Sequence, residues 1–110
     1  MKLLFISAVL AIGSAHAAES YPVDEAKVRS ALDSKLKDSE SARLKNLAAK
    51  KNGMAVIDLC GDVNAKNSYG AYSGYERFYG VIAPRVDGAD VYAILGIGSA
   101  AAEMCRQRGL

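Results

Sequence analysis

Positions 51–60 read Lys51-Asn52-Gly53-Met54-Ala55-Val56-Ile57-Asp58-Leu59-Cys60, and this stretch decides the fold. Asn-Gly is the strongest two-residue signal for a β-hairpin, because both residues tolerate the positive φ of a tight turn. The apolar, β-branched run that follows is typical of a buried strand. The sequence therefore predicts a hairpin whose second strand starts at Met54 and continues to about Lys66.

The residues before the turn, 42–50, fit two structures. The first four alternate apolar and charged side chains as a strand does, whereas Leu44, Leu47 and Ala48 also fit one face of a helix. The hairpin turn favours the strand, since the strand after such a turn needs an antiparallel partner before it. We therefore predict a strand over 42–50 and keep the helix as the alternative.

The chain beyond this hairpin alternates β-prone runs with turn residues. It predicts, in order, a loop over 67–74, a strand over 75–83, a turn over 84–88 and a strand over 90–95. Ser99 can cap a short helix over 100–108, which Gly109 ends. On that helix Ala101, Ala102 and Cys105 share one face, which is expected to pack on the sheet.

The N-terminal part of the domain is predicted to hold one more helix. Residues 18–22 read as a frayed tail, and the helix runs from a cap at Asp24 to about Lys37, with Val28 and Leu32 in its apolar stripe. The predicted fold is a single α+β domain over 18–110. It has an antiparallel sheet of about four strands, with an N-terminal and a C-terminal helix on one face.

The first seventeen residues have the pattern of a signal peptide. A basic start at 1–2 and an apolar run over 3–12 precede Ala15-His16-Ala17, the small-x-small pattern that signal peptidase reads. The apolar run is too short to span a bilayer, and no second run follows, so we expect no membrane span after cleavage. A signal of this kind indicates a bacterial protein that is periplasmic or secreted.

The chain has two cysteines, Cys60 and Cys105, and both predicted locations oxidise thiols. We therefore predict a disulfide bond between them, which stabilises the fold by about 3–4 kcal/mol in the chain-entropy account. A reactive thiol is the alternative. It is disfavoured because the chain has no C-x-x-C spacing and no histidine near either sulfur in the mature protein.

The composition excludes several classes of function. The single histidine, His16, belongs to the signal peptide, so we expect no histidine-dependent catalysis, no zinc site and no other metal site. The 14 Lys and Arg against 12 Asp and Glu give too small a basic excess for a nucleic-acid binder. No phosphate-binding glycine motif is present, and we expect no cofactor.

Three carboxylates, Asp58, Asp62 and Glu76, are the candidates for hydrolytic chemistry. Asp58 and Asp62 share a strand face about 13 Å apart, which is wider than a glycosidase pair. Asp62 and Glu76 across a hairpin remain the candidate pair, although ion pairs with Lys66 or Arg77 are the simpler interpretation. We expect that the protein is not an enzyme. Asp58, in an apolar strand, must face solvent or have a buried partner.

One segment is unusually rich in glycine and tyrosine. It reads Cys60-Gly61-Asp62-Val63-Asn64-Ala65-Lys66-Asn67-Ser68-Tyr69-Gly70-Ala71-Tyr72-Ser73-Gly74-Tyr75-Glu76-Arg77-Phe78. Together with Lys37-Asp38-Ser39-Glu40-Ser41-Ala42-Arg43-Leu44-Lys45-Asn46, it resembles a group of small exported bacterial proteins, mostly uncharacterised, which have Pro where this chain has Ser39. No activity is established for that group, so the resemblance supports only the fold and the export.

The segment over 61–78 has a structural and a functional interpretation. Its glycines permit turns, its asparagines can bond the loop backbone, and its tyrosines can cover a core without tryptophan. Alternatively, the tyrosines that recur every three residues form a recognition surface. The residues of that possible binding surface are Asn64, Lys66, Asn67, Tyr69, Tyr72, Tyr75 and Arg77.

The basic residues also have two interpretations. Six of them gather in the first half of the chain: Lys35, Lys37, Arg43, Lys45, Lys50 and Lys51. They are either a solvated face or an attraction for an acidic partner or envelope polymer. The sequence thus predicts an exported, non-catalytic binding module for a protein or glycan of the cell envelope. The alternative is an inhibitor or immunity-type protein that blocks an envelope-acting enzyme.

Overall fold

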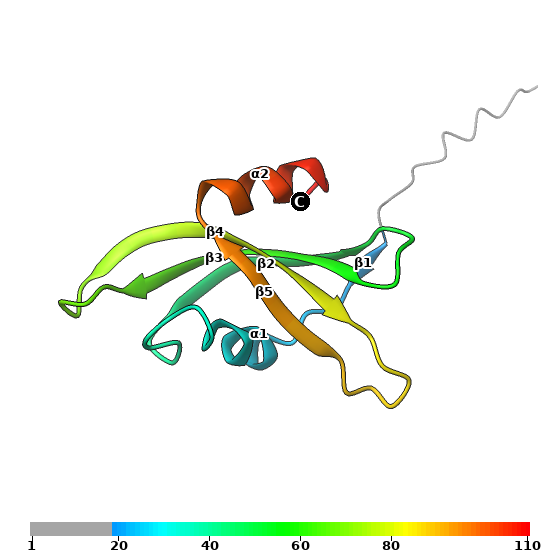
Figure 1. Ribbon diagram of the computed structural model, residues 1–110, viewed down its shortest axis with the longest axis horizontal. Helices are drawn as coiled ribbons and strands as arrows, with labels where there is room; N and C mark the ends of the chain where they lie inside the picture. The colour runs from blue at the N-terminus through cyan, green and yellow to red at the C-terminus, as the bar shows by residue number, and fades with distance from the viewer. Residues whose placement is uncertain (1–18) are drawn as a thin grey trace, which may run out of the picture.

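The computed structural model describes residues 19–110, so the predicted signal peptide lies outside the described residues. The elements, in chain order, are β1 (Ser20–Tyr21), α1 (Glu25–Leu32), β2 (Arg43–Lys51), β3 (Ile57–Lys66), β4 (Tyr72–Ala83), β5 (Val91–Ile97) and α2 (Ser99–Gln107) (Figure 1). The five strands form one antiparallel sheet in the order β1-β2-β3-β4-β5. The small α+β fold is therefore confirmed, with five strands rather than about four.

The additional strand comes from the segment that was expected to fray. Ser20 pairs with Lys50 and Tyr21 with Ala49, and the Lys51 amide donates to the Glu19 carbonyl at 3.0 Å. Tyr21 also packs against the main core. This apolar anchor holds the N-terminal segment on the edge of β2, and the prediction of a loose tail was wrong.

The strand over 42–50 is confirmed as β2, but the turn after it differs from the predicted one. Lys51 pairs with Ile57, so Met54 lies in a loop and not in β3. Gly53 has a positive φ of 80°, whereas Asn52 does not adopt one. The Asn52 side chain instead accepts from the Met54 amide at 2.9 Å and donates to Asp58 at 2.8 Å. Side-chain hydrogen bonds therefore stabilise a longer turn.

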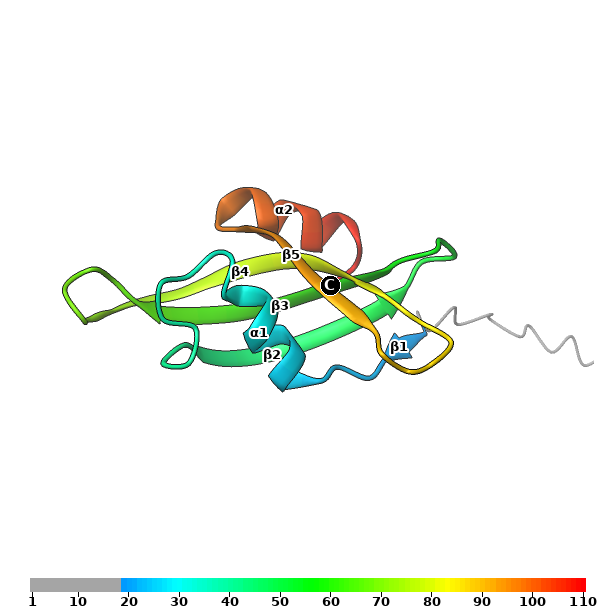
Figure 2. The same ribbon diagram turned by 60° about the horizontal axis from the view of Figure 1, so that its bottom comes forward.

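The two helices lie on opposite faces of the sheet, and the prediction that both cover one face was wrong (Figures 1 and 2). The reason is that β3 is buried on both sides. Leu59 and Val63 join the core that contains α1, whereas Cys60 joins the core that contains α2. The side chains of a strand alternate between faces, so neighbouring residues of β3 contribute to different cores.

The core on the α1 side is the larger one. Its buried members come from α1, from the residue before β2 and from every long strand: Val28, Leu32, Ala42, Ala49, Ile57, Leu59, Val63, Phe78, Ile82 and Ile94. The core on the α2 side is small and consists of Cys60, Tyr79, Ala101 and Cys105. The predicted disulfide bond between Cys60 and Cys105 is present there, with its Cα atoms 6.0 Å apart. It links the centre of the sheet to α2.

Each helix differs from its prediction at one end. Asp24 caps α1 as expected, accepting from the Ala26 amide at 3.0 Å, but the helix ends at Leu32 instead of Lys37. Arg29 explains the early end, because its guanidinium donates to the carbonyls of Ser39 and Ala42 and holds the following loop against the helix. In α2 the N-cap is Gly98, not Ser99, and no side chain caps the helix.

Candidate functional site

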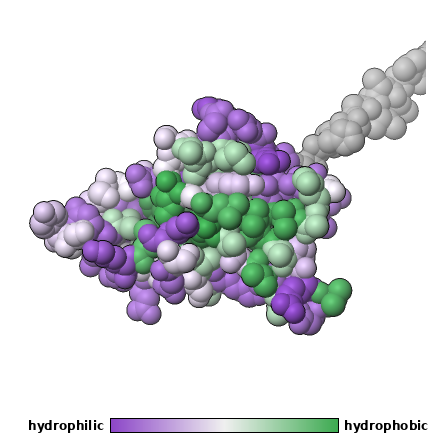
Figure 3. Space-filling view, in the orientation of Figure 1, coloured by the Kyte–Doolittle hydropathy of each residue, from purple (hydrophilic) through white to green (hydrophobic). Residues whose placement is uncertain are grey.

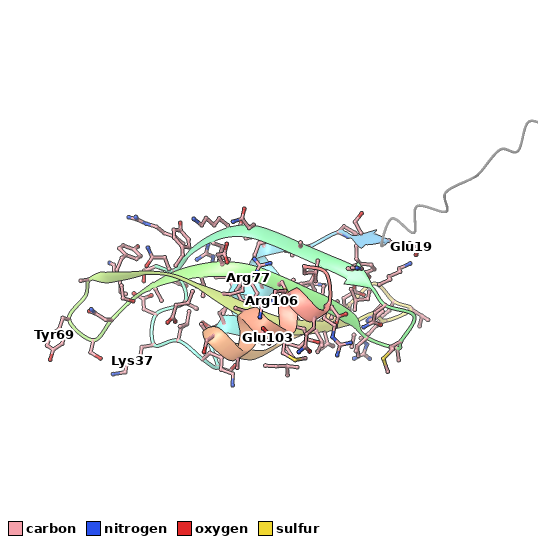
Figure 4. The ribbon with its side chains drawn as sticks, turned by 90° about the horizontal axis from the view of Figure 1, so that it is seen from above. Glu19, Lys37, Tyr69, Arg77, Glu103 and Arg106 are labelled. Atoms are coloured by element: carbon pink, nitrogen blue, oxygen red, sulfur yellow. A yellow bond between two sulfur atoms is a disulfide. The ribbon has the colours of Figure 1, made fainter. Side chains whose placement is uncertain are left out.

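The β3–β4 hairpin projects beyond both helices at one end of the molecule (Figure 1). Its turn is shorter than predicted, because β4 already begins at Tyr72. Asn67 organises it: the side-chain oxygen accepts from the amides of Tyr69 at 2.9 Å and Ala71 at 3.2 Å, and the Asn67 amide donates to the Ala71 carbonyl at 2.7 Å. Tyr69 is presented at the tip, 95% exposed (Figure 4).

Asn64 has a similar role further down the hairpin. It is buried, and its side-chain oxygen accepts from the Gly74 amide at 3.0 Å. Gly74 has a φ of 104°, a conformation that favours glycine. Both asparagines of the predicted surface thus hold the hairpin backbone, which fits the structural interpretation of the segment for these two residues.

The other two tyrosines of the predicted surface contact basic side chains. The Arg43 guanidinium lies 4.0 Å from the centre of the Tyr72 ring, and the Lys66 ammonium lies 5.7 Å from it. The Lys45 ammonium lies 3.9 Å from the centre of the Tyr75 ring. These are cation–π contacts, each of which contributes about 0.5–1 kcal/mol at an exposed site. They orient the cations without neutralising them.

The two rings differ in their exposure. The Tyr72 hydroxyl donates to the Ser41 carbonyl at 2.7 Å, so Tyr72 also anchors the loop before β2. Tyr75 has no such bond to the backbone and is 43% exposed. We call the surface formed by Arg43, Lys45, Lys66, Tyr69, Tyr72 and Tyr75 the hairpin end.

The structure places five of the six basic residues of the first half of the chain in two groups, and the sixth, Lys35, is exposed in the turn after α1. Arg43 and Lys45 lie at the hairpin end, and Lys37 lies at the same end of the molecule as Tyr69 (Figure 4). Lys50 and Lys51 belong to the opposite end of β2. There Lys50 donates to the Arg108 carbonyl at 3.1 Å, and Lys51 pairs with Glu19 at 3.6 Å. These last two cations have partners within the protein.

Arg77, a predicted member of the surface, is turned toward α2 instead. Its guanidinium lies 3.3 Å from the Asp62 carboxylate and donates to the Leu110 carbonyl at 2.7 Å. The Asn46 side chain donates to the same carboxylate at 2.8 Å. Asp62 and Arg77 therefore fix the C-terminal segment to the sheet, and Arg77 is not part of the hairpin end.

The candidate hydrolytic pair is separated by the sheet. Asp62 lies opposite Arg77 in the β3–β4 register, whereas Glu76 lies opposite Val63, so the two carboxylates point to opposite faces. They cannot flank one scissile bond.

Asp58 has the buried partners that its position requires. Its carboxylate accepts from the Tyr79 hydroxyl and from the Asn52 side-chain amide, each at 2.8 Å, and lies 3.9 Å from Arg108.

Three hollows of the described surface, of 350, 350 and 230 Å³, lie beside α1, at the end of α2 and between α2 and β5. None of the six hairpin-end residues lines them. Apolar side chains gather elsewhere, in a band below α2 (Figure 3). The hairpin end is thus a projecting, polar and basic surface.

The pairing of rings with cations is the part of the site that the sequence did not reveal. Arg43 and Lys45 were counted only as charges, although their alternation along a predicted strand was a sign that they share a face.

Within residues 19–110, no helix has the length and apolarity needed to cross a membrane. Comparisons with protein-family models, curated proteins and solved structures find no match to this chain.

Proposed function

We propose that the protein is an exported, non-catalytic binding module that contacts a protein or glycan of the cell envelope through its hairpin end. The observation that carries the proposal is a rigid hairpin with an exposed tyrosine at its tip and cations held on tyrosine rings at its base. Tyrosine and arginine are enriched where interfaces gain most of their binding energy. The turn built by Asn67 limits the ordering cost of binding.

Export is supported by two observations. The sequence begins with the pattern of a signal peptide, and the disulfide bond suits an oxidising compartment such as the periplasm. A non-catalytic role is supported by the separation of Asp62 and Glu76 on opposite faces of the sheet.

The test is capture from an envelope extract by immobilised residues 18–110. We expect the protein to retain a specific partner and the Tyr69→Ala, Tyr75→Ala double variant to lose it. Val86→Ala is the matched control, because Val86 is fully exposed but lies in the β4–β5 turn. Equal capture by the double variant and the wild type, with both proteins folded by circular dichroism, would contradict the proposal.

An inhibitor or immunity-type protein is the second candidate, and it is favoured by the shape of the hairpin end. A module that holds a small saccharide usually offers a concave site. A projecting tip instead suits insertion into a cleft of another protein, as long antibody loops do. Deletion of the gene is expected to reduce protection against an envelope-acting enzyme if this second candidate is correct.

A further inference from the structure

We propose that the partner of the hairpin end is an enzyme that cleaves envelope glycans and whose substrate cleft is lined by carboxylates. This inference rests on the proposed function and names the class of partner. Shape is the first observation that supports it. The β3–β4 hairpin extends past α1 and α2 (Figure 1), and Tyr69 lies at its tip, 95% exposed (Figure 4). A narrow two-stranded projection fits a long open cleft better than it fits a flat surface.

Uncompensated charge is the second observation. Among residues 19–110, Arg43, Lys45 and Lys66 form no ion pair, and each contacts a tyrosine ring instead. The nearby carboxylate of Asp62 is occupied by Arg77 and Asn46. The partner surface is therefore expected to be acidic, because like charges across an interface cost several kcal/mol.

Asp38 is the acidic group that acts on Lys66, and it is already engaged locally. Hydrogen bonds from Ser41, with a smaller contribution from Lys66, lower the pKa of the Asp38 carboxyl. An ionised Asp38 offsets part of the charge of Lys66. The excess of positive charge at the hairpin end therefore comes from Arg43 and Lys45 of β2, which form no ion pair among residues 19–110.

Glycan-cleaving enzymes combine the two properties that this surface requires. Most use a pair of Asp or Glu residues on either side of the scissile bond, in a cleft open to a polymeric substrate. A tyrosine has the size and amphipathic character to occupy a sugar-binding position. In the proposed complex Tyr69 enters the cleft, and Arg43, Lys45 and Lys66 face carboxylates at its rim.

The probes are three purified enzymes that cleave glycans containing N-acetylglucosamine: a c-type lysozyme, a lytic transglycosylase and a chitinase. We expect residues 18–110 to inhibit glycan cleavage by at least one of them at near-stoichiometric concentration. Tyr69→Ala, and separately Arg43→Gln with Lys45→Gln, should raise the half-inhibiting concentration at least about tenfold. Lys51→Gln is the matched control, since Lys51 is equally basic but lies at the other end of β2, and it should leave inhibition unchanged.

Occupancy of the cleft is tested on the inhibited enzyme. Tri-N-acetylglucosamine should compete with the protein for binding, and replacing the enzyme's catalytic carboxylates by amides should weaken the complex. Full activity of all three enzymes, or binding that the saccharide does not affect, would overturn the inference. If envelope capture still depends on Tyr69 in that case, the binding role stands and only the class of partner is wrong. If none of the enzymes is inhibited and envelope capture does not depend on Tyr69, both proposals are wrong.

Discussion

At the scale of single residues, Asp58 is a buried carboxylate held by several partners. It is 2% exposed and accepts hydrogen bonds from Tyr79 and Asn52, with Arg108 at 3.9 Å. The sequence indicated that an aspartate in this apolar strand needs either solvent or a partner. It could not name the partners, because they come from a turn, a neighbouring strand and the end of α2.

Removing this carboxylate is predicted to destabilise the fold strongly. Asp58→Ala leaves the Tyr79 hydroxyl without its acceptor and should lower the free energy of unfolding by about 3 kcal/mol. Tyr79→Phe removes one hydrogen bond to a charged group and should cost about 1.5–2 kcal/mol. Urea unfolding followed by circular dichroism measures both. Equal stability of Asp58→Ala and wild type would contradict this account.

A second residue pair predicts how stability depends on pH. The Tyr21 hydroxyl donates to Asp90 at 2.6 Å, and this bond lowers the pKa of Asp90, helped by the Arg85 amide. The same bond raises the pKa of Tyr21. The contribution of Asp90 is therefore present above its ordinary pKa of about 3.9 and is lost as the pH falls through its lower folded value.

The matched variant is Tyr21→Phe, which removes the bond and keeps the ring. We expect it to be less stable than wild type at pH 7, with a smaller loss of stability as the pH falls below about 4. On the alkaline side, the wild type should lose the contribution of Tyr21 as the pH rises beyond about 10, whereas the variant should not. Parallel pH profiles of the two proteins would refute this role.

At the scale of elements, two glycines determine how closely the strands pack. A Cβ atom on Gly80 would lie 2.4 Å from the Ala93 carbonyl oxygen, and one on Gly61 would lie 2.6 Å from the side chains of Leu47 and Phe78. The added atom at Gly80 would therefore meet backbone, whereas the added atom at Gly61 would meet side chains. Both strands were predicted from their apolar patterns, but patterns alone do not reveal such close approaches.

These contacts predict a ranking of three substitutions. Gly80→Ala should destabilise most, by about 3 kcal/mol, and Gly61→Ala by about 1–2 kcal/mol, since side chains can shift more readily than a paired strand. Gly96→Ala is the control, because nothing lies within 4 Å of its added Cβ. Thermal unfolding of the three variants gives the order, and a Gly96 variant as unstable as the Gly80 variant would contradict it.

The elements also show where prediction from sequence reached its limit. β2 and the course of β3 to Lys66 followed from alternation and from the position of the Asn-Gly pair. The turn itself differed because the Asn52 side chain bonds to Met54 and Asp58, a choice that depends on the folded β3. The short α1 likewise depends on Arg29, whose carbonyl acceptors lie ten or more residues away.

At the scale of the whole molecule, the disulfide bond contributes much of what holds α2 on the sheet. The core on that side has only four buried residues, two of which are the bonded cysteines. The sequence predicted the disulfide bond but not which face of the sheet α2 covers. That prediction would have needed the fact that β3 is buried on both sides. The sequence had named Lys66 and the three tyrosines of the hairpin end as a possible binding surface. Arg77, which was named with them, lies against Asp62 and Leu110 instead.

Reduction is therefore predicted to loosen one face of the protein first. Breaking the bond should lower the free energy of unfolding by about 3–4 kcal/mol. The amides of α2 should exchange with deuterium faster, while those of α1 change little. Hydrogen exchange with and without reductant measures this difference. Uniform acceleration in both helices would show that the bond stabilises the whole domain and not the α2 face.

The outer border of the sheet at β5 has a consequence for behaviour at high concentration. β5 ends the strand order, yet the Lys27 ammonium donates to the Asp90 carbonyl at its start, and the register with β4 is interrupted at Leu95. Fibril growth requires a straight, continuous border on which further strands can add. A lysine and an irregular residue break that template, so we expect that further strands do not add at the β5 border of the folded chain.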